Sequence, residues 1–358
     1  MNVGILTGGG DCPGLNAVIR AIVRKGIFHY RDQFVGFIEG WRGVLENNSV
    51  ALDLKAVADI LPRGGTILRT SRTNPAKREG GLEQCLRNLE QNKVDALVAI
   101  GGDDTMGVAL KLNERGFKIV GCPKTIDNDL AGTDLCFGFD TAVMIATEAI
   151  DRVHSTAESH NRTIVVEVMG RNAGWIAIYS GIAGAADVIL IPEKPFDIDE
   201  VAETLKRQQS QSGRRYSIVV VAEGAKFAET GHGPVVQTAG KDEFGHERLG
   251  GIGQVLAQEI EKRTKFETRA VVLGHTQRGG TPTAFDRVLG TRYGTGAIDL
   301  VHKGEFGRMV ALHGTEIVSV PLAAALSVNR TVDDKLIAVA QGLQDSSPSG
   351  ARETRKAG

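Results

Sequence analysis

The stretch VDALVAIGGDDTMGVALKLNERG (Val94–Gly116) predicts a strand, a glycine turn and a helix in direct succession. Its first residues are almost all apolar, as expected of a strand that is buried on both faces. A turn of this kind commonly binds phosphate, because the unpaired N–H groups and the dipole of the following helix favour an anion. Here, however, the turn carries two adjacent carboxylates, Asp103 and Asp104. One of them is suited to hold a metal ion, whereas the second adds negative charge where a phosphate is expected.

Apolar runs of strand length alternate with helical patterns along most of the chain. The other runs expected to form strands cover residues 3–6, 118–122, 163–168, 188–190, 217–222 and 270–273. This alternation predicts α/β layers with mostly parallel sheets, in which ligands bind beyond the carboxyl ends of the strands. The length of 358 residues suggests about two domains.

The composition argues against several classes of protein. A net charge of −1 gives no electrostatic reason to expect nucleic acid or an anionic membrane as a partner. No apolar run approaches the roughly 20 residues of a membrane span, and the N-terminus lacks the basic region of a signal peptide. The four cysteines are widely spaced, which fits a reducing cytosol better than a disulfide framework or a zinc site. We therefore expect a cytoplasmic protein.

The first strand leads into TGGGDCPGLN (Thr7–Asn16), a glycine-rich turn before a helix. It is neither the dinucleotide fingerprint, because the third glycine is missing, nor a P-loop, because no G-K-[ST] occurs in it. It predicts a backbone cradle for a phosphate near Gly10, and an ordinary glycine turn is the alternative. GGDDT (Gly101–Thr105) indicates phosphoryl transfer more strongly, because similar loops occur in NAD kinases and lipid kinases. Its alternative is that one of the two carboxylates merely caps the helix.

A second acidic turn, PKTIDND (Pro123–Asp129), follows the next expected strand. In an extended stretch Asp127 and Asp129 would point the same way, because they are two residues apart. One carboxylate is then suited to act as a base while the other holds a magnesium ion, directly or through water. A solvated loop with this composition is the alternative.

Basic residues gather at the ends of later strands. SHNRT (residues 159–163) leads into a strand that ends in MGR (residues 169–171), and TRAVVLGHTQRGG covers residues 268–280. Arginine is suited to bidentate contact with a phosphate, so several such residues predict a fixed anionic substrate group. Glu223 ends another strand and suits sugar hydroxyls, although a structural ion pair is equally open.

Several stretches resemble, in their order and spacing, the signature motifs of the phosphofructokinase family over roughly Val3 to Gly307. They are GGGDCPGLN, GGDDT, PKTIDND, SHNRT with VEVMGR, and LGHTQRGGTP. The resemblance implies two Rossmann-like α/β/α domains with the active site in the cleft between them. Residues 1–139 and 277–321 would form the donor- and magnesium-binding domain, and residues 140–276 the sugar-phosphate domain. No chemical role is assigned to the C-terminal segment 322–358, and its tail from about Ser346 is expected to be poorly ordered.

The resemblance also implies a role for each matching residue. Gly10 would contact the donor phosphate, Asp103 would bind Mg²⁺ with Asp129 near the metal, and Asp127 would be the general base. The residues implied in binding or transferring to fructose 6-phosphate are Thr125, Ile126, Asp127, Arg162, Met169, Gly170, Arg171, Glu223, Arg269, His275, Thr276, Gln277 and Arg278. Thr125 and Arg171 would also touch the reacting phosphoryl group. Because Arg162 and Arg269 usually reach in from a neighbouring subunit in this family, a homodimer or homotetramer is expected.

Asp104 and Lys124 indicate which donor is used. Members of the family that use ATP usually have glycine at the position of Asp104, which leaves room for the α-phosphate. A carboxylate there resembles the members that use pyrophosphate, in which a lysine at the position of Lys124 assists the leaving phosphate. The sequence thus predicts reversible transfer from pyrophosphate to the 1-hydroxyl of fructose 6-phosphate. An ATP-dependent enzyme and a non-catalytic regulatory subunit of the same fold are the alternatives.

Overall fold

The computed structural model describes residues 1–228, 236–241 and 247–344. The poorly ordered tail expected from about Ser346 lies outside these residues. The chain divides into two compact units, of which unit 1 falls within Met1–Ile145, Val236–Arg248 and His275–Arg330. Unit 2 falls within Ala146–Val235, Leu249–Gly274 and Thr331–Gly358. The C-terminal segment is therefore shared between the units, with the change at residues 330 and 331.

Unit 1 is built on a seven-stranded sheet with the order β13-β12-β5-β4-β1-β2-β3. The strands are β1 (Asn2–Thr7), β2 (Gln33–Phe37), β3 (Ser49–Ala51), β4 (Ala96–Gly101), β5 (Ile119–Pro123), β12 (Arg308–His313) and β13 (Glu316–Pro321). The inner strands pair in parallel, and β3 and β13 pair antiparallel at the two edges. Every residue of β4 is buried, which explains its unbroken apolar run.

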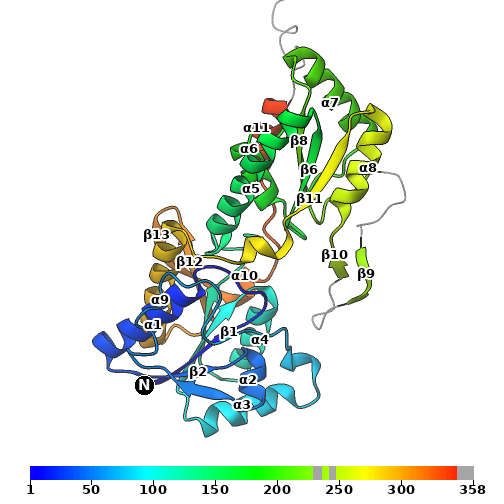
Figure 1. Ribbon diagram of the computed structural model, residues 1–358. Coiled ribbons are helices and arrows are strands. Elements are labelled where there is room, and N and C mark those ends of the chain that lie inside the picture. The colour runs from blue at the N-terminus through cyan, green and yellow to red at the C-terminus, as the bar shows by residue number, and fades with distance from the viewer. Residues whose placement is uncertain (229–235, 242–246, 345–358) are drawn as a thin grey trace, which may run out of the picture. The chain divides into compact units, whose positions relative to one another are not determined.

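Helices cover both faces of this sheet (Figure 1). Those of unit 1 are α1 (Leu15–Lys25), α2 (Trp41–Leu45), α3 (Gly81–Gln91), α4 (Asp103–Glu114), α9 (Ala284–Lys303) and α10 (Leu322–Ala325), with shorter turns η1 (Gly26–Tyr30), η2 (Pro75–Lys77) and η3 (Gly274–Arg278). The core on one face joins α2, α3 and α4 to the sheet through side chains such as Trp41, Leu89 and Met106. Helices α1 and α9 pack together on the other face.

Unit 2 is a smaller α/β unit with a four-stranded parallel sheet in the order β11-β6-β8-β7. Its strands are β6 (Thr163–Val168), β7 (Val188–Leu190), β8 (Ser217–Ala222) and β11 (Thr268–Val272). Its helices are α6 (Trp175–Ala183), α7 (Ile198–Ser212), α8 (Ile252–Thr264) and α11 (Asp334–Gln344), and α5 (Phe139–His160) runs from unit 1 into unit 2. The strands β9 (Val236–Lys241) and β10 (Glu247–Leu249) form a separate two-stranded sheet, most of which belongs to unit 1. The predicted α/β class with mostly parallel sheets is confirmed.

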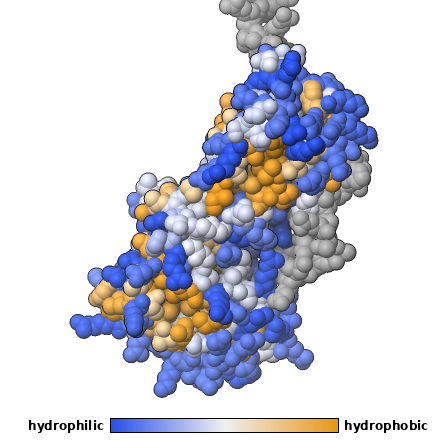
Figure 2. Space-filling model, in the orientation of Figure 1, coloured by the Kyte–Doolittle hydropathy of each residue, from blue (hydrophilic) through white to orange (hydrophobic). Residues whose placement is uncertain are grey.

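Large apolar side chains remain exposed in both units. Phe28 and Val288 of unit 1 are 63% and 60% exposed, and Leu343 of unit 2 is 71% exposed. Apolar patches interrupt the hydrophilic surface in Figure 2. Contiguous apolar patches often mark surfaces that bind another protein. Self-association stays a prediction, and exposed apolar surface is compatible with it.

Asp286 is a buried polar anchor in the first turn of α9. Its carboxylate accepts hydrogen bonds from the backbone N–H groups of Gly138 and Thr141 at 2.9 and 2.8 Å and from the Thr141 hydroxyl at 2.5 Å. Burial raises the pKa of Asp286 to about 6. The start of α5 and the start of α9 are thereby fixed to each other within unit 1.

Replacing Asp286 by alanine should lower the free energy of unfolding by about 2–4 kcal/mol, because buried N–H donors lose their acceptor. An Asp pKa near 3.9 in the unfolded chain lies below the folded value, so the folded protein binds more protons between about pH 4 and 6. The contribution of Asp286 to the free energy of unfolding therefore falls as the pH rises through that window. The difference in the free energy of unfolding between the wild type and Asp286→Ala should narrow accordingly. Urea titrations at several pH values test this, with the exposed Glu114→Ala as control. A gap that widens with pH would contradict it.

Candidate active site

Three loops of unit 1 leave the same edge of its sheet. In the parallel register Thr7 of β1 lies opposite Ile100 of β4, and Gly101 of β4 lies opposite Pro123 of β5. The loops that follow these strands hold Gly10, the pair of carboxylates at the start of α4, and TIDND. All three therefore meet at the carboxyl edge of the sheet, where parallel α/β folds bind ligands.

The glycine-rich loop after β1 is shaped by close approaches. Gly9 has a left-handed φ of +78°, and a Cβ on Gly8 would lie 2.5 Å from the hydroxyl oxygen of Thr105. The N–H of Gly9 donates to the Ser71 carbonyl at 3.1 Å, and the Thr70 hydroxyl donates to the Gly9 carbonyl at 2.5 Å. Sequence reasoning missed this supporting segment around Ser71, because it follows no strand and carries no motif. Hydroxyl side chains clustered around an arginine in TSRT were the only local signal.

Two cations flank Gly10. The Lys124 ammonium donates to the Gly10 carbonyl at 2.5 Å, and Arg278 Nη1 donates to the Asp11 carbonyl at 3.2 Å. A Cβ on Gly10 would lie 2.6 Å from the same guanidinium nitrogen, so this residue lets the arginine approach. Burial lowers the pKa of Lys124. A loop lined by two cations suits an anionic donor group.

Asp103 and Asp104 lie in the first turn of α4, and neither occupies the N-cap. The N-cap is Gly102, which has no side chain that could cap the helix. The alternative that one of the carboxylates merely caps the helix is therefore not supported at the N-cap position. Because they are in the first turn, both residues lie near the positive end of the helix dipole. Asp103 is exposed to solvent, and Asp104 is half-buried.

The TIDND loop brings its carboxylates together by a turn. The chain turns at Ile126 and Asp127, and Asn128 is buried with a left-handed φ of +52°. The expectation of an extended stretch is therefore wrong, because a left-handed residue reverses the local direction of the backbone. The N–H of Asp127 donates to the Thr125 hydroxyl at 3.1 Å, which stabilises the turn.

The acidic side chains interact strongly with one another. Burial raises the pKa of Asp129, and together with the charges of Asp127 and Asp103 it brings this pKa to about 7. No group of three or more His, Cys, Asp or Glu side chains in the described part of the chain is placed to enclose a metal. Mg²⁺ needs no such cage, because it is commonly held by one or two carboxylates together with water and substrate phosphates. The crowded carboxylates Asp103 and Asp129 fit that ion.

In unit 2, MGR and Glu223 meet at the carboxyl edge of the sheet. Val168 of β6 lies opposite Ala222 of β8, and the Glu223 N–H donates to the Val168 carbonyl at 2.9 Å. The N–H of Gly224 donates to the Gly170 carbonyl at 3.0 Å. The strand-end turns that carry Met169, Gly170, Arg171 and Glu223 are thereby joined.

Arg162 and Arg269 lie at the opposite end of the same strands. Both pair with Glu267, at 2.8 and 2.7 Å, and the hydrogen bond from Arg162 holds the pKa of Glu267 below its ordinary value. β6 separates Arg162 from Met169, and at about 3.3 Å per residue this amounts to roughly 20 Å. Unit 2 of one chain therefore does not bring these arginines to Arg171.

The remaining predicted residues belong to η3 in unit 1. Gln277 is buried, whereas His275 and Thr276 are exposed and Arg278 lies against the glycine-rich loop as described above. The four residues of the expected 6-phosphate clamp, Arg162, Arg269, His275 and Arg278, are thus divided between the two units.

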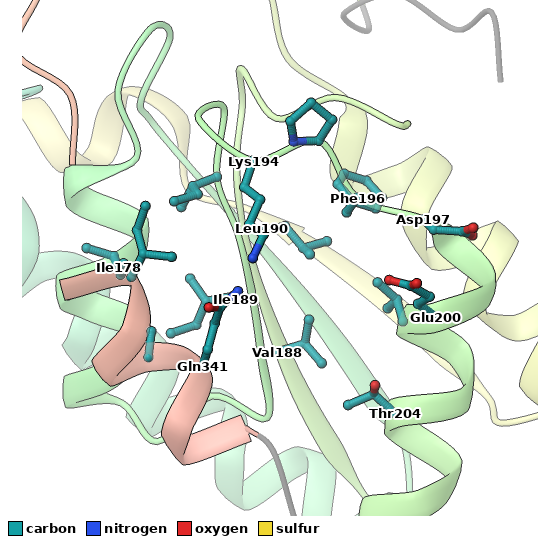
Figure 3. A pocket seen from close by; sticks show the side chains of 15 residues that line it. Ile178, Val188, Ile189, Leu190, Lys194, Phe196, Asp197, Glu200, Thr204 and Gln341 are labelled. Carbon is teal, nitrogen blue, oxygen red and sulfur yellow. The ribbon is translucent and has the colours of Figure 1, made fainter. Parts of the chain in front are cut away.

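A separate hollow of about 240 Å³ lies in unit 2 over the edge strand β7 (Figure 3). Ile178 of α6, Gln341 of α11 and Thr204 of α7 come from its different walls, and Lys194 points into it. Among the described residues that line it there is no predicted site residue.

Comparison with known proteins identifies close relatives. The phosphofructokinase profile matches residues 2–301. A pyrophosphate–fructose 6-phosphate 1-phosphotransferase of Amycolatopsis methanolica is 60% identical over 93% of this chain and 96% of its own length. An ATP-dependent 6-phosphofructokinase of Streptomyces coelicolor is 51% identical over 95% of this chain and 99% of its own. The phosphofructokinase of Pichia pastoris, solved in its T-state, superimposes with a TM-score of 0.81 at 31% identity, over 96% of this chain and 36% of that one.

None of the helices in the described ranges is both long enough and apolar enough to cross a membrane.

Gly224 should tolerate no side chain, because an added Cβ would overlap the carbonyl oxygen of Arg171. Gly224→Ala should therefore displace the MGR turn and lower the free energy of unfolding by about 1–3 kcal/mol, as overpacking does. Gly342→Ala is the matched control in unit 2, since its Cβ meets nothing within 4 Å and alanine favours the helix. Thermal unfolding of both variants measures the difference, and equal midpoints would refute the close contact.

Proposed function

Because the chain belongs to the phosphofructokinase family, we propose that it transfers a phosphoryl group reversibly from pyrophosphate to the 1-hydroxyl of fructose 6-phosphate. The products are fructose 1,6-bisphosphate and phosphate. The proposal includes a dependence on Mg²⁺ and a homo-oligomeric enzyme that works in the cytoplasm.

The donor assignment depends chiefly on one observation, the half-buried carboxylate of Asp104 in the first turn of α4. A helix N-terminus at a strand end is where a phosphate chain would bind. A carboxylate there takes up space and repels a third phosphate, and pyrophosphate has none to place. Lys124, whose ammonium donates to the Gly10 carbonyl, supplies positive charge for the leaving phosphate. The name of the relative at 60% identity supports the same donor.

Asp127 is the proposed general base. Its carboxylate accepts the proton of the sugar 1-hydroxyl as the oxygen attacks the phosphorus, and its backbone is held by the Thr125 hydroxyl. Bound Mg²⁺ would neutralise charge on the donor oxygens, with Asp103 and Asp129 as the residues that hold it. Lys124 and Arg171 stabilise negative charge on the phosphoryl group. Transfer of this kind depends mainly on positioning and electrostatics.

The sugar phosphate is proposed to bind at the joined strand ends of unit 2. Met169, Gly170 and Arg171 would line the sugar, and Glu223 would accept hydrogen bonds from its hydroxyls. Arg162 and Arg269 would reach the 6-phosphate of a neighbouring subunit's site. Their place at the far end of β6 supports this sharing, because their own unit keeps them about 20 Å from Met169.

ATP is the second candidate donor, because relatives at 51–53% identity carry the name ATP-dependent 6-phosphofructokinase. A non-catalytic regulatory subunit is disfavoured, since such a subunit is expected to have lost the base or a metal ligand. Asp103, Asp127 and Arg171 are all present.

Substituting Asp104 tests the donor assignment. At an effective dielectric constant of about 20, two charges near 4 Å repel by about 4 kcal/mol, which would penalise ATP by several hundred-fold or more. Asp104→Gly removes both charge and volume, so ATP should become a measurable donor while pyrophosphate turnover falls. Asp104→Asn keeps the volume and removes only the charge, and should recover a smaller part. The measurement is the ratio of kcat/KM for pyrophosphate over ATP in the wild type and both variants.

A wild-type protein that prefers ATP would overturn the proposed donor. A ratio that is the same in Asp104→Gly as in a pyrophosphate-specific wild type would overturn the role of Asp104 alone.

Mixing two impaired variants, assayed at a low concentration of fructose 6-phosphate, tests the shared site. Asp127→Ser should lower kcat by about 10²–10⁴-fold, since it removes the base. Arg269→Ala should raise the KM for fructose 6-phosphate by one to two decades, since a charged hydrogen bond contributes roughly 1.5–3 kcal/mol. If subunits exchange, the mixture should regain activity, because a hybrid oligomer contains one intact site. Full activity of a strictly monomeric wild type would refute the sharing.

A further inference from the structure

Arg330 contacts the TIDND loop from a distant part of the chain. Its backbone N–H donates to the Asp129 carbonyl at 2.8 Å, and its guanidinium Nη1 donates to the Asn128 carbonyl at 3.3 Å. An antiparallel bridge pairs the preceding residue, Asn329, with Leu130. Arg330 is the last residue of unit 1 and lies beyond the stretch that the family profile matches, residues 2–301.

The loop needs such support because regular secondary structure does not hold it. Between the end of β5 and the start of α5 the described chain forms only turns and isolated bridges. Asn128 adopts a left-handed conformation, which costs free energy in a residue other than glycine and persists only where the surroundings enforce it. Its side chain is held from one side, where the Cys136 N–H donates to Oδ1 at 2.8 Å and Nδ2 donates to the Asp134 carbonyl at 3.4 Å.

Arg330 holds the backbone of the same loop. Its two hydrogen bonds fix the carbonyls of Asn128 and Asp129, the residues that directly follow Asp127. The two peptides that carry these carbonyls flank Asp129, so rotation of either would turn its carboxylate away from its present direction. It would also disturb the left-handed turn at Asn128, which directly follows Asp127. The guanidinium also places a positive charge beside a loop that carries crowded carboxylates, which favours the compact arrangement.

We propose that Arg330 is a positioning residue for phosphoryl transfer, an inference that rests on the proposed function. It holds the Asn128–Asp129 backbone so that Asp127 meets the acceptor hydroxyl and Asp129 stays beside Asp103. In this role it acts through the loop and not through a contact with substrate. The C-terminal stretch that ends unit 1 thereby takes part in forming the active-site edge.

Three variants separate positioning from general stability. Arg330→Ala keeps the backbone hydrogen bond and loses the guanidinium, and Arg330→Lys keeps the charge without the forked donor geometry. Arg292→Ala is the matched control, because the Arg292 guanidinium also donates to a backbone carbonyl, that of Thr315 in the turn between β12 and β13. Each is assayed with pyrophosphate, Mg²⁺ and fructose 6-phosphate, and each is examined without substrate by hydrogen–deuterium exchange.

Arg330→Ala should lower kcat by about 10- to 100-fold, as a misplaced catalytic group does, with the KM for fructose 6-phosphate changed by no more than about threefold. Arg330→Lys should recover part of the loss, and Arg292→Ala should match the wild type. Exchange should accelerate at the amides of Asp127 and Cys136, while β6 stays unchanged. Wild-type kinetics in Arg330→Ala, or a loss of kcat without faster exchange in residues 124–137, would overturn the proposal.

The two ways of failing remain distinguishable. If the wild type transferred no phosphoryl group, the proposed function would fail, and exchange alone would decide whether Arg330 holds the loop. Faster exchange confined to residues 124–137 would then support its positioning contact, and unchanged exchange would refute it.

Discussion

Parallel pairing of β1, β4 and β5 is the constraint on which the site of unit 1 depends. Because parallel strands end at the same edge, the glycine-rich loop, the start of α4 and TIDND have to meet. The consequence is a concentration of like charge, in which Asp127 and Asp103 both raise the pKa of Asp129. Such crowding is unfavourable in an empty site and becomes favourable when a cation binds. The charged groups of Lys124 and Arg278 donate hydrogen bonds to the glycine-rich loop, at the carbonyls of Gly10 and Asp11. This edge of the sheet therefore presents both signs of charge to a metal–phosphate donor.

Strands buried on both faces were the most predictable part of the fold. The apolar runs at 163–168, 188–190 and 217–222 coincide with β6, β7 and β8, because nearly every residue in these strands is buried. Strands β2, β3, β9, β10, β12 and β13 were not predicted. β13 has four half-buried residues and lies at an edge, so its sequence carries no continuous apolar run. A strand that is stabilised mainly by its partner leaves a weak signal in its own composition.

The place of a motif in the fold was predictable wherever the motif follows a strand, since the strand-end rule fixes that place without knowledge of tertiary contacts. The site was not predictable where distant segments meet. The approach of Arg278 to Gly10 depends on glycine leaving the space, and no local pattern reveals which side chain fills it. The turn at Asn128 was missed because it is enforced by Cys136, Asp134 and Arg330, which are up to 202 residues away in the sequence. The same reasoning applies to the Ser71 segment under Gly9.

The rest of the functional account follows from the choice of phosphoryl donor. Equilibrium binding of donor analogues measures this preference without catalysis. Calorimetric titration of the wild type in the presence of Mg²⁺ would compare imidodiphosphate with β,γ-imido-ATP, two analogues that do not transfer a phosphoryl group. We expect imidodiphosphate to bind more tightly by at least about 100-fold, because only the longer analogue brings a third phosphate toward Asp104. Equal or tighter binding of β,γ-imido-ATP would contradict the account.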